Sequence, residues 1–398
     1  MRVLQLCHKP PYPIKDGGCL AINQISQSLL SQGVELHILS LATPKHPFLK
    51  KEFPNKYLEQ THFTPIFVDT TVNAVDAFVN LITSDSYHVS RFFSSDVDKH
   101  ICQVLERNEF DIVLCESIFT APYIDTIRRL SSAKIVLRSH NLEFSIWHRI
   151  AKSKKLGLKK AYLNILTKQL KDYEIQILEQ IDGLIAINPD ELKHYKRLGL
   201  RKKSTTIPFA VELDNYNPAG QSEPKSVFHL GSMDWQPNLE GIEWFLHRVW
   251  PLVIKKNPEL KLYLAGRQMP DWLLKHEQKG VKVIGEVDDA QDFIKSKNIM
   301  VIPLKSGGGM RVKLVEALAL QKPVVSTPLG ANGVSIKDGK NILIARQPKE
   351  FAQAILALAE GNGKASELGI QGRKLVEKEY DSEKLSEKLM GFLKMLQP

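Results

Sequence analysis

Short apolar runs, rich in β-branched residues, alternate with longer amphipathic segments along the whole chain. Short apolar runs bounded by turn-forming residues predict buried strands, and the amphipathic segments between them predict helices. The predicted strands are Val3–Cys7, Glu35–Leu41, Ile112–Glu116, Lys134–Ser139, Gly183–Ile187, Ser226–Leu230, Leu260–Ala265, Val281–Ile284, Ile299–Pro303 and Pro323–Thr327. The predicted helices include Ala21–Gln32, Leu239–Lys256, Met310–Leu320 and Ser382–Met395. This alternation predicts an α/β fold in which helices cover both faces of parallel sheets.

The pattern begins twice, which predicts two Rossmann-like domains. Val3–Cys7 leads through a Pro-rich loop ending in Gly17-Gly18 into a helix, and Ser226–Leu230 leads into a second loop and helix. We expect an N-terminal domain over residues 1–207 and a second domain over 208–378. Prolines and glycines between residues 207 and 224 mark the linker. For the C-terminal helix, over 379–398, packing back on the first domain is one option.

Composition places the chain among globular proteins of reducing compartments. Apolar residues make up 43% of the chain and charged residues 25%, and no window approaches the ~18 uninterrupted apolar residues of a membrane-spanning helix. The first eight residues read as a strand, without the apolar core and cleavage site of a signal peptide. The cysteines, which form no CxxC pair, are Cys7, Cys19, Cys102 and Cys115. We expect reduced, structural thiols in a cytoplasmic protein.

The net charge of +10 is concentrated in the first half of the chain. Residues 1–205 carry 28 basic and 21 acidic side chains, and much of the excess lies in 152–160 and 193–203. Such runs are typical of solvated helix faces, but they also suit an anionic membrane surface or an acidic acceptor. No arginine-rich arm or zinc-finger spacing points to nucleic acid.

The segment from Ser306 to Pro323 carries the strongest chemical signal. Its consecutive glycines, Gly307, Gly308 and Gly309, follow a predicted strand and precede a predicted helix, so backbone amides and the positive end of the helix face the same ligand. Arg311 and Lys313 stand in the first turn, where cations oppose the macrodipole by roughly 0.3–1 kcal/mol each. A bound phosphate explains that placement, and Glu316 then suits vicinal hydroxyls such as those of a ribose. The alternative is a capping loop in which Glu316 pairs with Lys313 three residues earlier.

From Met1 to about Lys378 the chain resembles a GT-B glycosyltransferase of the large retaining family GT4, also called glycosyltransferase group 1. The matching segments are Asp16-Gly17-Gly18, Ser139-His140-Asn141, 182–188, 231–238, 264–266, 285–288 and the Ser306–Pro323 block with 324–327. The resemblance implies two Rossmann-like domains whose parallel sheets face a central cleft. It further implies that the second domain holds a nucleotide sugar, that the first holds the acceptor, and that no cofactor or obligatory metal takes part.

The resemblance also assigns roles to individual residues. Glu316 matches the family's ribose-binding glutamate, and Gly17 and Gly18 match the loop that brings backbone amides near the diphosphate. His140 matches a histidine that hydrogen-bonds a hydroxyl of the donor sugar, although a satisfied core or capping histidine remains open. Val287 matches a position whose backbone pairs with the nucleotide base.

The chain departs from the family pattern in two places. The first of the family's two paired acids would fall at position 308, which is glycine, so backbone amides of Gly307–Met310 would hold the donor sugar. The loop after the second domain's first strand, with Gly231, Ser232 and Asn238, lacks the family's usual cations. Arg311, Lys313 and Arg267 are the cations left to face the diphosphate. The chain therefore resembles a subgroup with Gly-x-Gly-x-Arg-x-Lys-x-x-Glu in place of the two-acid motif.

The expected activity is that of a hexosyltransferase-type enzyme (EC 2.4). It would transfer a sugar with retention from a nucleotide-diphosphate sugar to a carbohydrate or lipid-linked acceptor, in polysaccharide or glycolipid biosynthesis. Expected catalytic residues are His140, Arg311 and Lys313, with Asp16 as a weaker candidate base whose alternative is a turn-forming role. The expected location is the cytoplasm, with peripheral association at the inner membrane face left open. Competing readings are a nucleotide-sugar epimerase of the same fold, a dinucleotide-dependent oxidoreductase and a non-catalytic nucleotide-sugar-binding protein.

Overall fold

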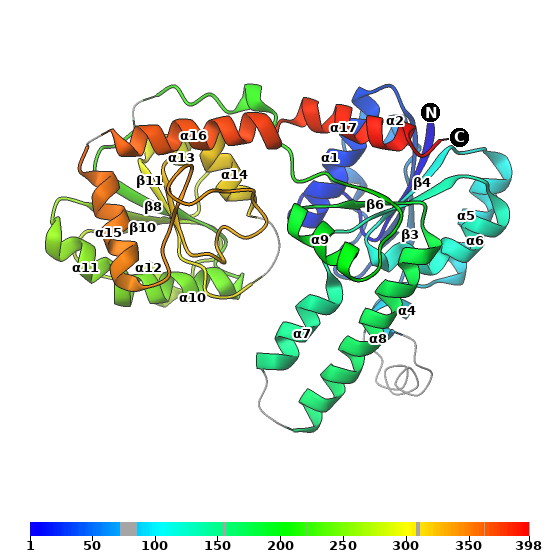
Figure 1. Cartoon of the computed structure of the whole chain (residues 1–398), viewed down its shortest axis with the longest axis horizontal. Coiled ribbons are helices and arrows are strands. Elements are labelled where there is room, and N and C mark those ends of the chain that lie inside the picture. The colour runs from blue at the N-terminus through cyan, green and yellow to red at the C-terminus, as the bar shows by residue number, and fades with distance from the viewer. Residues whose placement is uncertain (72–85, 154–156, 221, 308–310, 362, 398) are drawn as a thin grey trace. The chain divides into compact units, whose positions relative to one another are not determined.

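The computed structural model describes residues 1–71, 86–153, 157–220, 222–307, 311–361 and 363–397, except for the side chains of residues 153, 158 and 159. The chain divides into two compact units (Figure 1). Unit 1 comprises Met1–Phe209 and Glu383–Pro398, and unit 2 comprises Ala210–Ser382. Each unit is an α/β layer structure with its own parallel sheet. Among the described helices, none is both long and apolar enough to cross a membrane.

The sheet of unit 1 has seven parallel strands in the order β3-β2-β1-β4-β5-β6-β7. Its strands are β1 Arg2–Cys7, β2 Glu35–Ala42, β3 Thr64–Phe67, β4 Ile112–Glu116, β5 Lys134–Arg138, β6 Gly183–Ala186 and β7 Lys203–Thr206. The strand order reverses between β1 and β4, which pair directly. In doubly wound sheets, ligands bind outside the carboxyl ends of the strands at such a reversal.

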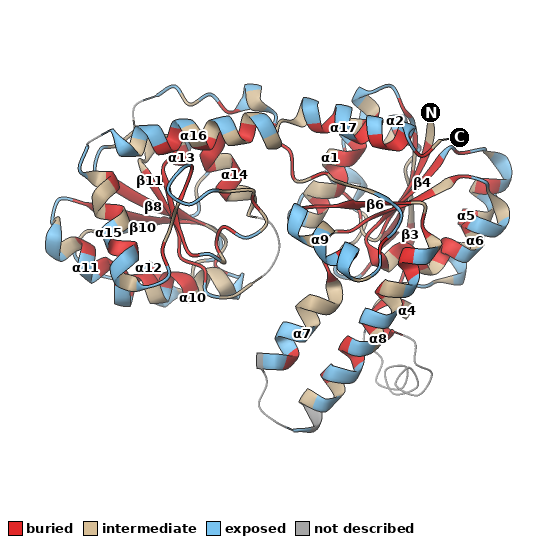
Figure 2. Cartoon of the chain, in the orientation of Figure 1, coloured by how far each residue is buried: buried red, intermediate tan, exposed pale blue. Residues whose placement is uncertain are grey.

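Helices cover both faces of this sheet. They are α1 Gly17–Ser31, α2 Asn55–Gln60, α4 Tyr87–Ser90, α5 Ser95–Arg107, α6 Ile124–Leu130, α7 Glu143–Ser153, α8 Leu158–Gln180, α9 Pro189–Arg197 and α17 Ser382–Lys394, with 3₁₀ turns at Lys50–Glu52 and Ile118–Tyr123. In Figure 1, α7 and α8 lie side by side and project from the body of the unit. The strands are buried and the outer helix faces are exposed (Figure 2), because the apolar residues of the amphipathic helices face the sheet.

The sheet of unit 2 has six parallel strands in the order β10-β9-β8-β11-β12-β13. They are β8 Ser226–Leu230, β9 Lys261–Ala265, β10 Val281–Gly285, β11 Ile299–Ile302, β12 Val324–Ser326 and β13 Leu343–Ile344. The helices are α10 Gln236–Trp244, α11 Trp250–Lys256, α12 Asp271–Leu274, α13 Ala290–Ser296, α14 Val312–Ala319, α15 Pro348–Ala359 and α16 Lys364–Glu379, with a 3₁₀ turn at Leu213–Asn215. The loops after β8, β9, β10 and β11 therefore meet at one carboxyl edge.

The α/β fold with two parallel sheets is confirmed, and all ten predicted strands form within two residues of their expected ends. Strands β3, β7 and β13 were not predicted because they are short and partly polar. The helix expected over Leu239–Lys256 is interrupted by a π-helical turn at Phe245–Val249. Pro251, at the start of α11, supplies no N–H for the preceding turn, which accounts for the altered hydrogen bonding there.

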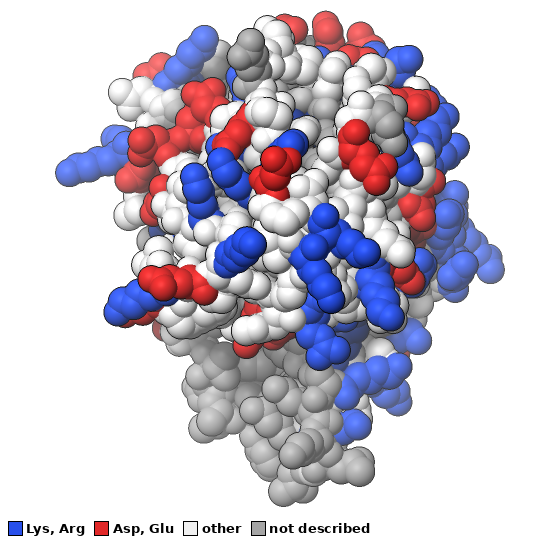
Figure 3. Space-filling model, turned by 90° about the vertical axis from the view of Figure 1, so that its left-hand side faces the viewer, with Lys and Arg blue, Asp and Glu red and all other residues white. Residues whose placement is uncertain are grey.

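Basic side chains form no single field on the surface that Figure 3 shows, where Lys and Arg are interspersed with Asp and Glu. In the basic run on α9, Lys193, Lys196 and Arg197 are exposed while Tyr195 is buried. Lys193 also pairs with Asp190 at 3.3 Å. This run is therefore the solvated face of an amphipathic helix.

Candidate functional site

Two glycines bring the loops after β8 and β9 into backbone contact in unit 2. Gly266 has a φ of +149°, and a Cβ added there would lie 1.7 Å from the carbonyl oxygen of Gly231. The Gly231 amide donates to the carbonyl of Ala265 at 3.1 Å. A Cβ on Gly231 would lie 2.7 Å from Asn238 Nδ2 and 3.0 Å from His229 Nε2. At Gly266 any Cβ would collide with the Gly231 backbone, and at Gly231 it would have to displace the side chains of Asn238 and His229.

The loop between β11 and α14 packs on the side chain of Trp235, the residue just before α10. Gly307 has a φ of +97°, and a Cβ there would lie 2.7 Å from Cζ2 of Trp235. The Arg311 guanidinium carbon lies 4.9 Å from the centroid of the Trp235 ring, a cation–π distance. Arg311 is the N-cap residue of α14, so its charge lies at the positive end of that helix. The predicted site residues Gly308, Gly309 and Met310 lie outside the described residues.

Glu316, on the second turn of α14, is held by two partners. The Tyr216 hydroxyl donates to Oε1 at 3.0 Å, and the Lys313 ammonium lies 3.1 Å from Oε2. The Glu316 side chain is 14% exposed and that of Lys313 is 40% exposed. Burial, with the adjacent Glu316 carboxylate, raises the pKa of the Tyr216 phenol, which therefore stays a donor. The Lys313–Glu316 pair, which the capping-loop alternative predicted, is therefore present, and Lys313 remains 40% exposed.

The remaining predicted donor-binding residues lie in the loops of the same edge. Asn238 Nδ2 donates to the carbonyl of Ser232 at 2.8 Å, and the Ser232 hydroxyl bonds Asp234. These two side chains thus brace the loop after β8. Arg267 is exposed just after β9, and Val287 is half-buried two residues beyond β10. All of these positions lie on unit 2, in the loops that follow β8, β9 and the edge strand β10.

In unit 1, a buried carboxylate organises the carboxyl ends of β4 and β5. Glu116 Oε1 accepts from Gln5 Nε2 at 2.8 Å, and Oε2 accepts from Arg138 Nη1 at 2.9 Å. His140 Nε2 lies 2.6 Å from the same Oε2. Burial alone would raise the pKa of Glu116, but Arg138 and His140 outweigh it and lower the pKa to about 2. Glu116 is therefore an ion at neutral pH, held by three donors.

This network fixes the tautomer of His140. Because an ionised oxygen 2.6 Å away can only accept, Nε2 of His140 carries the proton and Nδ1 keeps a lone pair. Burial lowers the pKa of His140, so the ring is neutral near pH 7. The ring of His8 packs edge-on against it at 5.2 Å, and His8 Nδ1 bonds the carbonyl of Glu116 at 2.9 Å. Burial also lowers the pKa of His8.

Asp16 acts as the cap of α1. Its Oδ1 accepts from the amides of Gly18 and Cys19 at 2.9 Å each, and both of its oxygens bond the Lys9 ammonium. Burial would raise the pKa of Asp16, but Lys9, the Cys19 amide and His46 hold it well below its usual range. A carboxylate of such low basicity is a weak proton acceptor, so these contacts favour the capping role over that of a base.

Gly17 is the first residue of α1, and Gly18 follows it in the first turn. A Cβ on Gly18 would lie 2.5 Å from Lys9 Nζ, so this glycine makes room for the Lys9–Asp16 pair. Asp16, Cys19 and His46 bring potential metal-ligand atoms within 4.8 Å of one another. The Lys9 ammonium already occupies both oxygens of Asp16, which disfavours a second cation there.

Three further acids of unit 1 lie at the root of the α7–α8 pair. Glu174 Oε1 accepts from the amides of Glu143 and Phe144 at 2.8 and 3.3 Å, which caps α7. Burial, aided by the neighbouring acids, raises the pKa of Glu174 to about 8. Burial likewise raises the pKa of Glu191 to about 8 and that of Glu143 to about 7. Glu174 is therefore largely protonated near pH 7.

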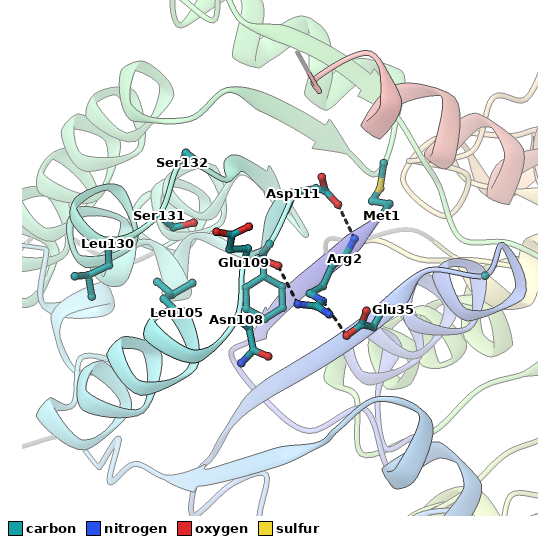
Figure 4. A pocket seen from close by; sticks show the side chains of 12 residues that line it. Met1, Arg2, Glu35, Leu105, Asn108, Glu109, Asp111, Leu130, Ser131 and Ser132 are labelled. Atoms are coloured by element: carbon teal, nitrogen blue, oxygen red, sulfur yellow. Dashed lines mark hydrogen bonds and ion pairs between the residues drawn. The ribbon is translucent and has the colours of Figure 1, made fainter.

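A polar pocket of about 770 Å³ lies at the opposite, amino edge of the unit 1 sheet (Figure 4). In this pocket Arg2 Nε lies 2.8 Å from Glu35 Oε1, and the Arg2 amide donates to Asp111 Oδ2 at 2.7 Å. Chemistry in parallel sheets belongs to the carboxyl edge. This pocket is therefore no part of the candidate site.

Sequence reasoning missed Glu116, Arg138, Gln5 and Tyr216. The signal for the first two was a charged residue closing each of two apolar strands, Ile-Val-Leu-Cys-Glu116 and Lys-Ile-Val-Leu-Arg138. Because β4 and β5 pair in register Glu116↔Arg138, opposite charges at those ends meet. Tyr216 lies 100 residues from Glu316 in an irregular segment, where no periodic pattern singles it out.

One segment of the chain matches a known protein family, and several known proteins resemble the chain in sequence. Residues 224–361 match the family described as Glycosyl transferases group 1. An uncharacterized 44.6 kDa protein in the cps region of Klebsiella pneumoniae is 24% identical over 391 residues, which cover 94% of this chain and 95% of that protein. The phosphatidyl-myo-inositol mannosyltransferase of Mycobacterium tuberculosis is 28% identical over 192 residues, covering 45% of this chain and 49% of that enzyme.

Solved structures share the fold over the whole chain. Sucrose-phosphate synthase from Thermosynechococcus elongatus has a TM-score of 0.68 at 16% identity, covering 100% of this chain and 99% of that one. Anabaena HepE in complex with UDP has a TM-score of 0.67 at 12% identity, covering 99% and 100%. The matched region, residues 224–361, contains Gly231, Trp235, Gly266 and Glu316. The chain has the GT-B fold, and residues 224–361 of its unit 2 match the group 1 glycosyltransferase family.

Proposed function

We propose that this enzyme transfers a hexosyl group, with retention of anomeric configuration, from a nucleotide-diphosphate sugar to a carbohydrate or lipid-linked acceptor. The observation that carries the donor assignment is the arrangement of Glu316, a largely buried carboxylate held by Tyr216 and Lys313 beside the N-terminus of α14. That arrangement offers an acceptor for hydroxyls and a positive helix end for an anion in one place.

The donor's charged part would face α14. Arg311, fixed over the Trp235 ring, and Lys313, half-exposed one turn before Glu316, supply two cations at the positive end of the helix. A diphosphate there carries about two negative charges and would be neutralised by these groups together with backbone amides. Once the ribose hydroxyls donate hydrogen bonds to Glu316, Lys313 is free to turn toward the phosphate. Because these cations are part of the chain, we propose that no metal or cofactor is needed.

In the proposed step, the acceptor hydroxyl attacks the anomeric carbon as the bond from that carbon to the diphosphate oxygen breaks. The hydroxyl proton passes to the departing phosphate, and the new bond forms on the face that the diphosphate leaves. Cations and amides fixed near the developing charge lower the barrier by several kcal/mol. His140, neutral and protonated on Nε2, would accept a hydrogen bond from a donor-sugar hydroxyl at Nδ1.

Two relatives support a proposal about the acceptor of the transfer and about the cellular location of the enzyme. One lies in a cps region, and another is named for an inositol phospholipid substrate. Both support an acceptor that belongs to polysaccharide or glycolipid assembly, and we propose a cytoplasmic enzyme that works at the inner membrane face. The exposed basic run on α9 is compatible with that location.

The proposal is tested by identifying donor and stereochemistry. UDP-linked sugars come first, since HepE binds UDP, followed by GDP- and ADP-linked sugars, each assayed by calorimetry with the full chain. With the donor that binds, proton NMR of the first-formed product on an acceptor library should show the anomeric configuration of the donor. An inverted product would refute retention, and donor binding without turnover on any acceptor would favour a non-catalytic role.

A further inference from the structure

A second concave region of unit 1 lies at the carboxyl ends of four neighbouring strands, β3, β2, β1 and β4. It is a cavity of about 460 Å³, formed by the residues that directly follow those strands and by the end of α4. The charged and titratable side chains that line it are Lys9, Lys45, Arg91, His8 and His46. Three threonine residues and the rings of Phe92 and Phe119 complete the lining.

The charge of this cavity is positive. Among the described residues that line it there is no aspartate or glutamate. Asp16 neutralises Lys9 from outside the lining, at 2.7 Å, and lies 3.7 Å from His46. Asp69, one residue before the lining residue Thr70, is exposed, and its carboxylate accepts a hydrogen bond from the amide of Thr71. Two cations, Lys45 and Arg91, are therefore left without a neutralising carboxylate among the lining residues.

The Arg91 guanidinium packs on an aromatic ring, but one of its donors has no hydrogen-bond partner among the described residues. Its guanidinium carbon lies 5.3 Å from the Phe92 ring centroid. Its Nε is buried and has no hydrogen-bond partner among the residues that the structure describes. Burial lowers the pKa of Arg91, which shows that its charge is partly removed from water. A partly desolvated guanidinium with an unused donor is stabilised by an oxyanion, and phosphate matches its fork of donors.

The part of the cavity next to Arg91 suits a neutral sugar. The rings of Phe92 and Phe119 are stacked with centroids 4.6 Å apart, which makes an apolar wall. His8 is neutral and uses Nδ1 on the carbonyl of Glu116, so its other ring nitrogen, Nε2, can accept from a hydroxyl. The threonine hydroxyls at Thr43, Thr70 and Thr71 add small donors and acceptors. One cavity thus combines an oxyanion site with a hydroxyl-binding wall.

We propose that this cavity binds a phosphate group carried by the acceptor, with the phosphate on Lys45 and Arg91 and the adjoining sugar against Phe92 and Phe119. The role of that molecule as acceptor rests on the proposed function. The affinity of the cavity for phosphate does not depend on it.

The test measures binding of inorganic phosphate to the full chain by calorimetry at constant ionic strength. The wild-type protein is compared with Lys45→Gln/Arg91→Gln and with the control Lys50→Gln/Lys51→Gln, which removes the same charge from exposed positions of the same unit. Any phosphate bound by unit 2 is common to all three proteins and cancels. We expect the pocket variant to bind phosphate at least about tenfold more weakly, or about 1.4 kcal/mol, and the control to behave as wild type. Equal binding by the pocket variant and wild type would overturn the proposal, as would equal weakening in the control.

Two further measurements keep the result interpretable. Calorimetry with UDP and the NDP-sugar panel should give the same donor affinity in wild type and pocket variant, so a failure of the donor assignment would leave the phosphate result standing. If the double variant fails to fold, Lys45→Gln alone, at an exposed loop position, should still weaken phosphate binding. Tighter binding of glucuronate than of glucose 1-phosphate would also overturn the proposal, because it would identify a carboxylate site.

A competition experiment distinguishes a lipid-linked from a soluble source of the phosphate. Sedimentation of phosphatidylcholine vesicles containing a polyprenyl phosphate, reversed by glucose 1-phosphate and weak in the pocket variant, would identify a lipid-linked acceptor. Binding of glucose 1-phosphate without vesicle binding would identify a soluble phosphorylated glycan. Both outcomes support the phosphate site, and loss of vesicle binding in the control variant alone would contradict it.

Discussion

Glu116 and His140 lie 2.6 Å apart, Oε2 to Nε2, at the ends of the neighbouring strands β4 and β5. Arg138 donates to the same oxygen at 2.9 Å, and the Glu116 side chain is fully buried. The carboxylate therefore sets the proton on one nitrogen of the imidazole and leaves the other as an acceptor. His140 can accept a hydrogen bond at Nδ1 only in this tautomer, so under the proposed function Glu116 would be a positioning residue for it.

Glu116→Gln should lower the free energy of unfolding by roughly 3 kcal/mol, because it leaves the Arg138 charge buried without its partner. The native pKa of Glu116 is about 2, below its usual 4.5, so its ionised form stabilises the fold fully above about pH 4.5. That contribution is lost as the pH falls toward 2, and it should be absent in the variant. Urea unfolding at pH 7 and pH 4 measures both effects. Glu106→Gln, at an exposed position in α5, is the matched control and should unfold like the wild type.

Glu174→Gln should have the opposite dependence on pH. The pKa of Glu174 is raised to about 8, so the folded protein holds a proton that the unfolded chain loses above about 4.5. Wild-type stability should therefore fall between about pH 5 and pH 8. Gln keeps the oxygen that caps α7 and carries no charge, so the variant should be more stable than wild type by roughly 1–2 kcal/mol at pH 8.5 and similar to it at pH 5.

Thermal unfolding at both pH values would test the Glu174 prediction. Glu179→Gln, exposed on the same helix, removes a charge without the buried environment and should leave the pH dependence unchanged. A wild-type midpoint that stays level from pH 5 to pH 8 would contradict the buried-acid interpretation.

Gly307→Ala should impair donor binding. The residue has a φ of +97°, and its new Cβ would meet Trp235 at 2.7 Å. The left-handed backbone costs roughly 1–2 kcal/mol for a residue with a Cβ, and displacement of Trp235 would add the loss of its contact with Arg311. Gly339→Ala is the control, since it has a φ of +74° with nothing within 4 Å. Calorimetry should show weaker nucleotide binding in the first variant and unchanged binding in the second.

Glu316→Gln should weaken binding of the preferred nucleoside diphosphate by about tenfold, the loss of one or two charge-assisted hydrogen bonds. The loss should be much smaller for the 2′,3′-dideoxy analogue, which has no hydroxyls for the carboxylate. Tyr216→Phe keeps the carboxylate and removes one of its partners, so it should affect both nucleotides alike. Equal losses for the two nucleotides in Glu316→Gln would remove Glu316 from the ribose.

The double variant Arg311→Ala/Lys313→Ala tests the diphosphate site. It should bind a nucleoside diphosphate at least about tenfold more weakly, while the free nucleoside should bind with little change. Lys255→Ala/Lys256→Ala, which removes two exposed cations from the last turn of α11 in unit 2, is the control for net charge. Unchanged diphosphate binding by a folded double variant would contradict the assignment.

The sequence predicted the features that depend on local pattern. Apolar runs such as Ser226–Leu230 form strands because burial on both faces requires continuous apolar residues, and the i, i+3 pair of Lys313 and Glu316 follows from helix geometry alone. The network around Glu116 depends on which strands pair and in what register, and neither can be predicted from the local sequence pattern. The same holds for Tyr216 and for the caps on α7, where long-range contacts decide the structure.

The closing helix of the chain sets the order in which the two units can be completed during synthesis. Leu389, Phe392 and Leu393 of α17 belong to the same buried core as Val3 in β1. Gly183 of β6 has no Cβ where one would lie 2.8 Å from Leu396, so the sheet leaves room for the Leu396 side chain. The ribosome makes every residue of unit 2 before it makes this helix, although most of unit 1 comes first. A nascent unit 1 therefore keeps an open apolar surface until this helix has been made, and a chaperone is most useful to it during that interval.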